Sequence, residues 1–221
     1  MFKVRLRFSK SGRLKFIGHL DFLRVFQQTI RRAGLAAAFS QGFNPHLLIS
    51  FALPLPLGME SANDYADLTL LEEIPSAEIV QKLNAAAPVG LDVKVAYPAG
   101  NKAASVVAVA DYALSFPHEN NAPEDYTSAI EKILYSETII IPKKTKKGVK
   151  DTDIRPDILS INMEKNRAIM RLSAGSSRFL HPLTMAEILF AEADLQEKPS
   201  AANLIRLELY QSTESGGLAT L

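Results

Sequence analysis

The spacing of hydrophobic positions changes sharply within the first 34 residues. Residues 2–8 alternate apolar and basic side chains, which predicts a half-buried strand with Lys3, Arg5 and Arg7 on its outer face. Residues 20–34 instead repeat apolar side chains every three or four positions, which predicts an amphipathic helix. The inward positions of that helix are Leu20, Leu23, Phe26 and Ile30, and Phe22, Val25 and Ala33 widen the apolar stripe.

The pattern continues to residue 97 as alternating short strands and helices. After the first strand and helix we expect strands at 47–53 and 65–71, a helix at 76–87 capped by Ser76, and a strand at 91–97, with 36–40 as a short additional strand. The resulting order is βαββαβ. Two split βαβ halves of this kind form a ferredoxin-like sandwich, with helices on one face of an antiparallel sheet.

Residues 98–105 have the composition of a linker, and a similar order follows them. A capping box of Thr184 and Glu187 predicts the start of the last helix. The expected elements of this half are strands 106–116, 138–141, 154–161, 168–172 and 204–210 and helices 123–135 and 184–191. We therefore predict an α+β chain of tandem ferredoxin-like domains, at 1–98 and 106–211, with a flexible tail at 212–221.

The amino-acid composition excludes several kinds of binding and catalytic site. The chain has no cysteine, which excludes disulfides, thiolate zinc sites and cysteine-ligated iron–sulfur clusters. Four scattered histidines lack metal-binding spacing, so we expect no metal and no cofactor. The sequence has neither a long apolar run nor the apolar core of a signal peptide, so we expect a cytoplasmic protein with no membrane partner.

The net charge of +1 conceals a strong segregation of charge. Residues 1–50 carry nine basic residues and one acidic residue, and residues 143–171 carry nine and four. Basic segments of this kind suggest an anionic partner, although lysine and arginine also serve simply to solvate a surface.

The residues with candidate binding chemistry lie mainly between positions 10 and 58. Basic side chains would neutralise phosphates, aromatic rings would stack on bases, and amides would read base edges, which makes RNA the expected ligand. The candidates are Lys15, His19, Arg24, Arg31, Gln41, Phe43, Asn44 and His46, with a second group at Lys143, Lys144, Lys146, Lys147 and Arg155. The alternatives are a buried plug at Phe43, a turn-forming amide at Asn44, and a merely solvated lysine loop at 143–150.

Two other functions fit the same residues. His19 and His46 are weak candidates for the acid and base of a metal-independent ribonuclease, assisted by Lys15, because imidazole titrates near neutral pH. A protein–protein docking subunit without any nucleic-acid role is the other alternative.

Several motifs resemble a known family. They are Lys15-Phe16-Ile17-Gly18-His19-Leu20-Asp21, Arg31-Arg32-Ala33-Gly34, Ser40-Gln41-Gly42-Phe43-Asn44-Pro45-His46 and Leu55-Pro56-Leu57-Gly58. Weaker elements are Asp153-Ile154-Arg155-Pro156, His181-Pro182-Leu183-Thr184 and Arg206-Leu207-Glu208. Together they resemble the radical SAM-linked protein family, a domain of unknown function encoded beside, or fused to, a radical SAM protein. Leu47-Leu48 departs from the family, in which a more polar segment is expected after His46.

The resemblance implies a radical SAM protein as partner. Such an enzyme holds its cluster with cysteines, and this chain has none, so it is not the catalyst of the pair. Many radical SAM enzymes modify RNA. We therefore expect a non-catalytic module that binds tRNA or rRNA and docks to a radical SAM enzyme.

Overall fold

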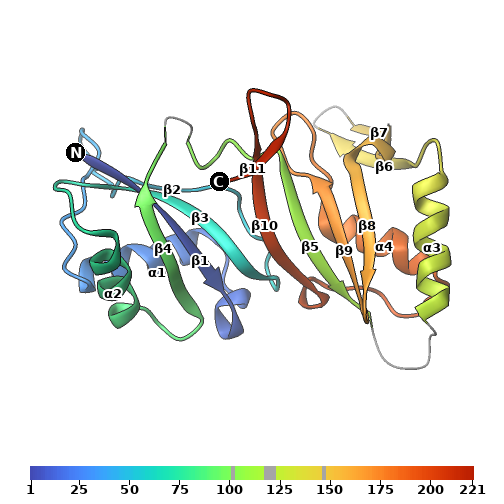
Figure 1. Ribbon diagram of the computed structural model, residues 1–221, viewed down its shortest axis with the longest axis horizontal. Helices are drawn as coiled ribbons and strands as arrows, with labels where there is room; N and C mark the ends of the chain where they lie inside the picture. The colour runs from blue at the N-terminus through green and yellow to red at the C-terminus, as the bar shows by residue number, and fades with distance from the viewer. Residues whose placement is uncertain (101–102, 117–122, 146–147) are drawn as a thin grey trace. The chain divides into compact units, whose positions relative to one another are not determined.

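The computed structural model describes residues 1–100, 103–116, 123–145 and 148–221, without the side chains of 123–125, 144 and 145. The fold is mixed α/β, and among these residues it has four α-helices and strands that are mostly antiparallel. Two compact units are present (Figure 1): residues 1–107 with 206–221, and residues 108–205. The sequence places the closing strand at 204–210 in the second half, whereas from Arg206 onward it belongs to the first unit.

The first unit is built on neighbouring strands in the order β4-β1-β3-β10, with β2 also paired to β3 and β11 to β10. Chain segment 12–16 forms a short 3-10 helix before the first α-helix. The elements are β1 (Phe2–Lys10), α1 (His19–Arg32), β2 (Ile49–Phe51), β3 (Glu60–Leu70), α2 (Ser76–Ala86), β4 (Leu91–Pro98), β10 (Leu204–Ser212) and β11 (Leu218–Thr220).

The core of the first unit lies between its sheet and both of its helices. The alternation of β1 is confirmed, because Val4, Leu6 and Phe8 are completely buried there. The helix prediction is wrong in one respect: Leu20 is 68% exposed, whereas Phe22 is buried. Leu20 and Phe22 are two positions apart in the sequence, which places them about 200° apart around the helix axis. A stripe through Phe22, Phe26 and Ile30 that faces the core therefore leaves Leu20 on the outside.

The second unit has the strand order β5-β9-β8 and a separate two-stranded sheet of β6 and β7. Pro142 was expected to end a strand at residue 141, but it lies within β6, opposite Asp151. A two-stranded sheet consists only of edges, where the missing N–H of a proline is tolerated. The elements are β5 (Val109–Ser115), α3 (Pro123–Tyr135), β6 (Ile140–Thr145), β7 (Gly148–Asp153), β8 (Ile158–Glu164), β9 (Arg167–Ser173) and α4 (Pro182–Glu192).

The two predicted helix caps are wrong. Helix α2 begins at Ser76, so Pro75 is its N-cap and no side chain caps it. Helix α4 begins at Pro182, two residues before Thr184, and His181 is its N-cap. The N–H of Leu183 donates to His181 Nδ1 over 3.2 Å. Proline suits the first helical position, which explains the earlier start of α4.

The last ten residues of the sequence contain a short strand, β11. Strand β11 pairs antiparallel with β10, with Thr220 opposite Tyr210. Leu221 is buried, and its carbonyl accepts a hydrogen bond from the Tyr97 hydroxyl. The expectation of a flexible tail at 212–221 therefore differs from the structure. Across the described residues, the helices are too short or too polar to cross a membrane.

Candidate nucleic-acid interface

The turn 40–46 is closed at its base and open at its tip. Ser40 N–H donates to the His46 carbonyl over 2.8 Å, His46 N–H donates to Ser40 Oγ over 3.0 Å, and Ser40 Oγ lies 2.8 Å from His46 Nδ1. Gly42 has φ +119°, a conformation that other residues rarely adopt. All six residues 41–46 are exposed, and Phe43 is exposed completely, at 105%. Phe43 is therefore not a buried plug.

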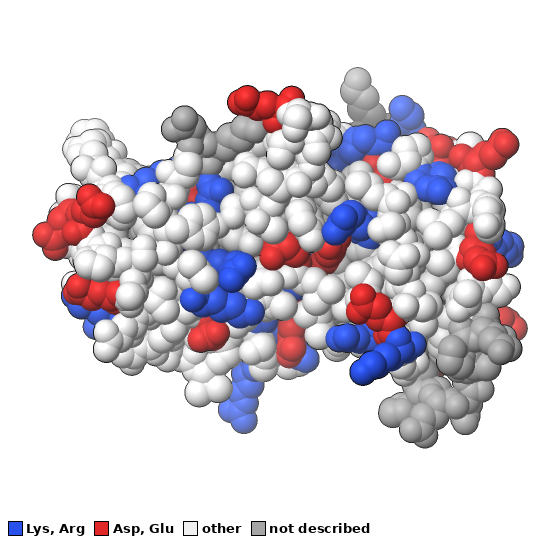
Figure 2. All heavy atoms as spheres, in the orientation of Figure 1, with Lys and Arg blue, Asp and Glu red and all other residues white. Residues whose placement is uncertain are grey.

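A basic stripe runs along the outer face of α1. Arg24 and Arg31 are seven residues apart, which places them on the same side of the helix, and both are exposed. Arg24 contacts Asp21 over 2.8 Å in an exposed ion pair of the kind that contributes little. Arg31 has no ion-pair partner among the described residues. Figure 2 shows Lys and Arg interspersed with Asp and Glu on the face in view, so no unbroken basic field is visible there.

The side chains of Lys15 and His19 already contact other residues of the first unit. Lys15 Nζ lies 3.3 Å from Glu60 and 5.4 Å from the centre of the Phe16 ring. His19 is the first residue of α1, and its ring meets the Phe51 ring edge-on at 5.6 Å. His46 is instead bonded to Ser40 and lines a different pocket. Nothing in the described part of the chain brings the two imidazoles together as an acid–base pair.

The second basic group is only partly described. Lys146 and Lys147 lie outside the described residues, as does the side chain of Lys144. Lys143 is exposed and donates to the Phe179 carbonyl over 3.2 Å.

Arg155 has a structural position. Its guanidinium donates to three carbonyls, those of Leu134, Ser136 and Ile158, at 2.7, 3.2 and 3.0 Å. Leu134 belongs to the last turn of α3, where carbonyls lack helical partners. Arg155 thus satisfies chain carbonyls, and we leave it out of the interface proposed below.

A buried ionic cluster in the first unit was not foreseen. Arg206 is completely buried, and its Nη2 donates to both oxygens of Asp64 at 2.6 and 2.7 Å. The same guanidinium donates to the carbonyls of Leu53 and Pro54. Burial raises the pKa of Asp64, while Arg206 opposes that rise. In the alternating segment 204–210, Arg206 looks like an outward residue, so the sequence carries no signal for this pair.

Two residues counted in the basic surface are in fact buried. Lys10, one of the nine basic residues counted in 1–50, ends β1 at 2% exposure, and its Nζ donates to the Ile17 carbonyl over 3.1 Å. Burial lowers the pKa of Lys10. Arg5, expected on the outer face of the strand, is buried and donates to Asp67 at 2.7 and 3.2 Å. The accessible charge of residues 1–50 is therefore smaller than the sequence count.

The family of the chain follows from a sequence comparison. A profile described as an uncharacterised protein conserved in bacteria, DUF2344, matches residues 3–182. The chain belongs to the DUF2344 family. No curated protein matches it significantly. Among solved structures, an unknown protein from Galdieria sulphuraria is 14% identical over 87% of this chain and 91% of that chain, with a TM-score of 0.29. A score at that level does not define a shared fold.

The DUF2344 match covers the features that carry the candidate interface. It includes α1, the turn 40–46 and Lys143, and it ends at Pro182, the first residue of α4. It contains Asp64 but not Arg206. The family description names no activity, so the role of the interface rests on the geometry of this chain.

Proposed function

We propose that this chain is an RNA-binding accessory protein that works with a radical SAM enzyme. Turn 40–46 carries the proposal, because it projects a fully exposed phenylalanine from a base held by Ser40 and His46. A fully exposed aromatic ring is free to stack on a base, and every nucleobase offers a face for stacking. Gln41 and Asn44 flank the ring with amides that suit base edges.

Cationic groups of the same unit supply the phosphate contacts in this proposal. Arg24 and Arg31 form the stripe on α1, and Lys15 lies beside the exposed Phe16 ring. The neutralisation of each phosphate releases counterions, so affinity should depend steeply on salt. We also interpret the first unit as ferredoxin-like; the order β4-β1-β3, with β2 on β3 and both helices packed on one core, supports this interpretation.

The test is the binding of total tRNA to the full-length chain, measured by filter binding at several salt concentrations. We expect Phe43→Ala to weaken binding by about tenfold, which corresponds to the loss of one stacked base. Val89→Ala is the matched control, because Val89 is an equally exposed apolar residue in the turn between α2 and β4. Binding that is undetectable at low salt, or equal for both variants, removes the proposed stacking surface.

The charge contribution is tested separately. The slope of log K against log [salt] measures how many phosphates the protein neutralises. Replacing Arg24 and Arg31 together by alanine should reduce the magnitude of this slope by about 1.4 to 1.8, the value for two phosphate contacts. Arg167→Ala with Lys198→Ala removes the same charge from other exposed positions. An equal loss in both double variants would mean that only the total charge matters.

Exposed apolar residues support the docking part of the proposal. Phe16 and Leu20 are 64% and 68% exposed, and Leu57 is also exposed. The segments are linked, because the N–H of Gly58 donates to the Lys15 carbonyl over 2.8 Å. Co-purification with a radical SAM protein of the same organism, after nuclease treatment, should be lost in Phe16→Ser with Leu20→Ser. Retention in that variant, or no co-purification of the wild type, contradicts docking at this surface.

A further inference from the structure

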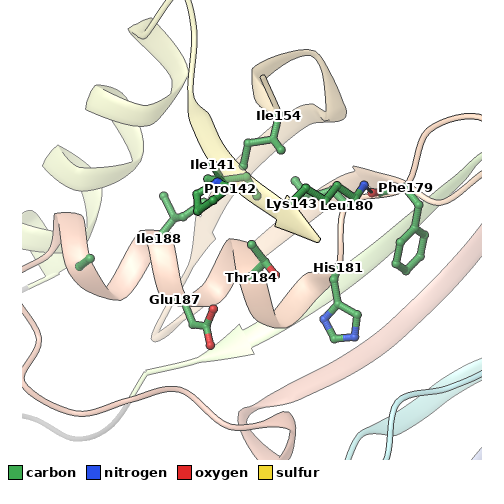
Figure 3. Close-up of a pocket in the computed structure, with 11 residues that line it drawn as sticks. Ile141, Pro142, Lys143, Ile154, Phe179, Leu180, His181, Thr184, Glu187 and Ile188 are labelled. Atoms are coloured by element: carbon green, nitrogen blue, oxygen red, sulfur yellow. Dashed lines mark hydrogen bonds between the residues drawn. The ribbon is translucent and has the colours of Figure 1, made fainter. Parts of the chain in front are cut away.

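The second unit contains a cavity that, among the predicted binding residues whose side chains the structure describes, only Lys143 lines. It has a volume of about 560 Å³ and lies between the β6–β7 hairpin and α4. Its apolar lining comes from Ile141 and Pro142 on β6, and from Ile188 and Ala191 on α4. Figure 3 shows Ile141, Pro142 and Ile188 gathered between the strand and the helix. The volume and the mainly apolar lining are those of a small-molecule site.

Polar groups stand at the margin of this cavity. Lys143 is exposed, and its one described hydrogen bond, to the Phe179 carbonyl, leaves further N–H donors on the ammonium. Glu187 is exposed and has no ion-pair partner among the described residues. In Figure 3 Glu187 and His181 extend to the same side of α4, where Thr184 adds a hydroxyl.

His181 is held in one tautomer. Its Nδ1 accepts the N–H of Leu183, so in the neutral ring the proton is on Nε2. Burial lowers the pKa of His181, which keeps the ring neutral at physiological pH. His181 therefore offers a hydrogen-bond donor to the cavity without adding charge.

These groups together select a class of ligand. A simple anion would be attracted by Lys143 but repelled by Glu187, so a phosphate or carboxylate alone fits poorly. A ligand that has an apolar ring, neighbouring N–H donors at one edge and an anionic group at another would pair with both Glu187 and Lys143. A carboxylate accepts two parallel N–H bonds, and among the common nucleobases guanine presents two adjacent N–H groups on its Watson–Crick edge.

We propose that this cavity binds a guanine nucleotide, with the base between the apolar walls, Glu187 on its N–H edge and Lys143 at the phosphate. The nucleotide is either a free mononucleotide or an unstacked nucleotide of an RNA chain. The proposal rests on the geometry of the second unit, so it does not require RNA binding at turn 40–46.

The experiment is calorimetric titration of the full-length chain with GMP, AMP, CMP, UMP and ribose 5-phosphate. We expect GMP to bind most tightly. Glu187→Gln should weaken GMP at least tenfold, because an amide replaces one acceptor by a donor, while Glu197→Gln, an exposed control in the same unit, should not. Lys143→Ala should weaken GMP but not guanosine, and Lys198→Ala should change neither. The replaced side chains are exposed, so circular dichroism should stay unchanged.

Short single-stranded RNAs with and without a single guanine distinguish a free mononucleotide from a nucleotide within an RNA chain. Binding of GMP that competes with RNA assigns the cavity to a free nucleotide as well as to RNA. A preference for the guanine RNA that Glu187→Gln abolishes, without binding of GMP alone, assigns it to an RNA chain. Equal affinities for all four nucleotides and ribose 5-phosphate, or no preference in either assay, overturn the proposal. Variants at Arg24, Arg31 and Phe43 should leave GMP binding intact, so this result is separable from the failure of the proposed interface.

Discussion

The two units treat charged side chains differently. Two ion pairs of the first unit have both partners buried, because Arg206 with Asp64 and Arg5 with Asp67 all lie below 6% exposure, although the same unit also has exposed pairs such as Arg24 with Asp21. The second unit keeps its pairs nearer to solvent, because Arg178 and Lys132 are more than half exposed where they meet Asp157 and Glu192. The buried basic residues, Arg5, Lys10 and Arg206, thus belong to the first unit, whereas Lys132, Arg171 and Arg178 of the second unit keep accessible side chains in their ion pairs. Charge counted along a sequence does not separate these cases.

The largest effect is expected where one partner of a buried pair is removed. Asp64→Ala leaves Arg206 buried without its carboxylate, and such a loss costs about 3–5 kcal/mol. Urea unfolding measures it. The control in the second unit is Lys132→Ala, which breaks a pair whose two partners, Lys132 and Glu192, are both accessible to solvent and should shift the unfolding midpoint only slightly.

Replacing both members of the first pair sharpens the comparison. Asp64→Leu with Arg206→Met removes both charges at similar volume, and it should recover most of the stability lost in Asp64→Ala. If the double variant is as unstable as Asp64→Ala, removal of the charge imbalance is not enough. The stability would then depend on the hydrogen bonds that Arg206 donates to the carbonyls of Leu53 and Pro54.

An intermediate effect is expected at Asp67. Burial alone would raise the pKa of Asp67, but hydrogen bonds from Arg5, Ala104 and Lys3 lower it below the usual value. The unfolded state then binds protons more readily, so the stabilisation is present above about pH 4 and is lost as the pH falls through the folded pKa. Asp67→Asn should cost about 1–3 kcal/mol at pH 7 and flatten the loss of stability as the pH falls below about 4. An unchanged acid profile would contradict this assignment.

The smallest effect is expected at the start of α4. His181→Ala should cost about 0.5–2 kcal/mol, the range for loss of an N-cap, whereas Thr184→Ala should cost less because Thr184 lies inside the helix. Because burial lowers the pKa of His181, its stabilisation is complete above about pH 6.5 and declines as the pH falls below it. His181→Asn retains a capping acceptor without titration, so its stability should not decline through that pH range. Thermal unfolding from pH 5 to 8 checks both expectations.

Periodicity predicts the elements better than the positions of single residues. The strand at 2–8 and the helix near 20–34 follow from alternation and from apolar spacing, which depend on local geometry. The exposure of Leu20 depends on which apolar positions of α1 face the sheet, and the caps at Pro75 and His181 depend on the residue at which each helix begins. Neighbouring positions of a helix differ by about 100°, so the apolar spacing alone does not fix either.

The candidate site shows the same limit. The turn 40–46 is evident from its glycine, asparagine and proline, and its exposure agrees with that composition. The partner of Asp64 is 142 residues away, so no local pattern indicates it. The cavity beside α4 combines residues of β6 and α4, and it too arises only when distant segments meet.

The separation between Asp64 and Arg206 has a consequence during synthesis. A ribosome adds about 5–20 residues per second, so the 142 residues between them take roughly 7–28 s to appear. During that interval the nascent first unit holds an acidic group whose eventual counter-charge has not yet been translated. The first unit can therefore complete its fold only after the second unit has been synthesised. The segment that carries Arg206 thus sets the time at which the first unit reaches its native state.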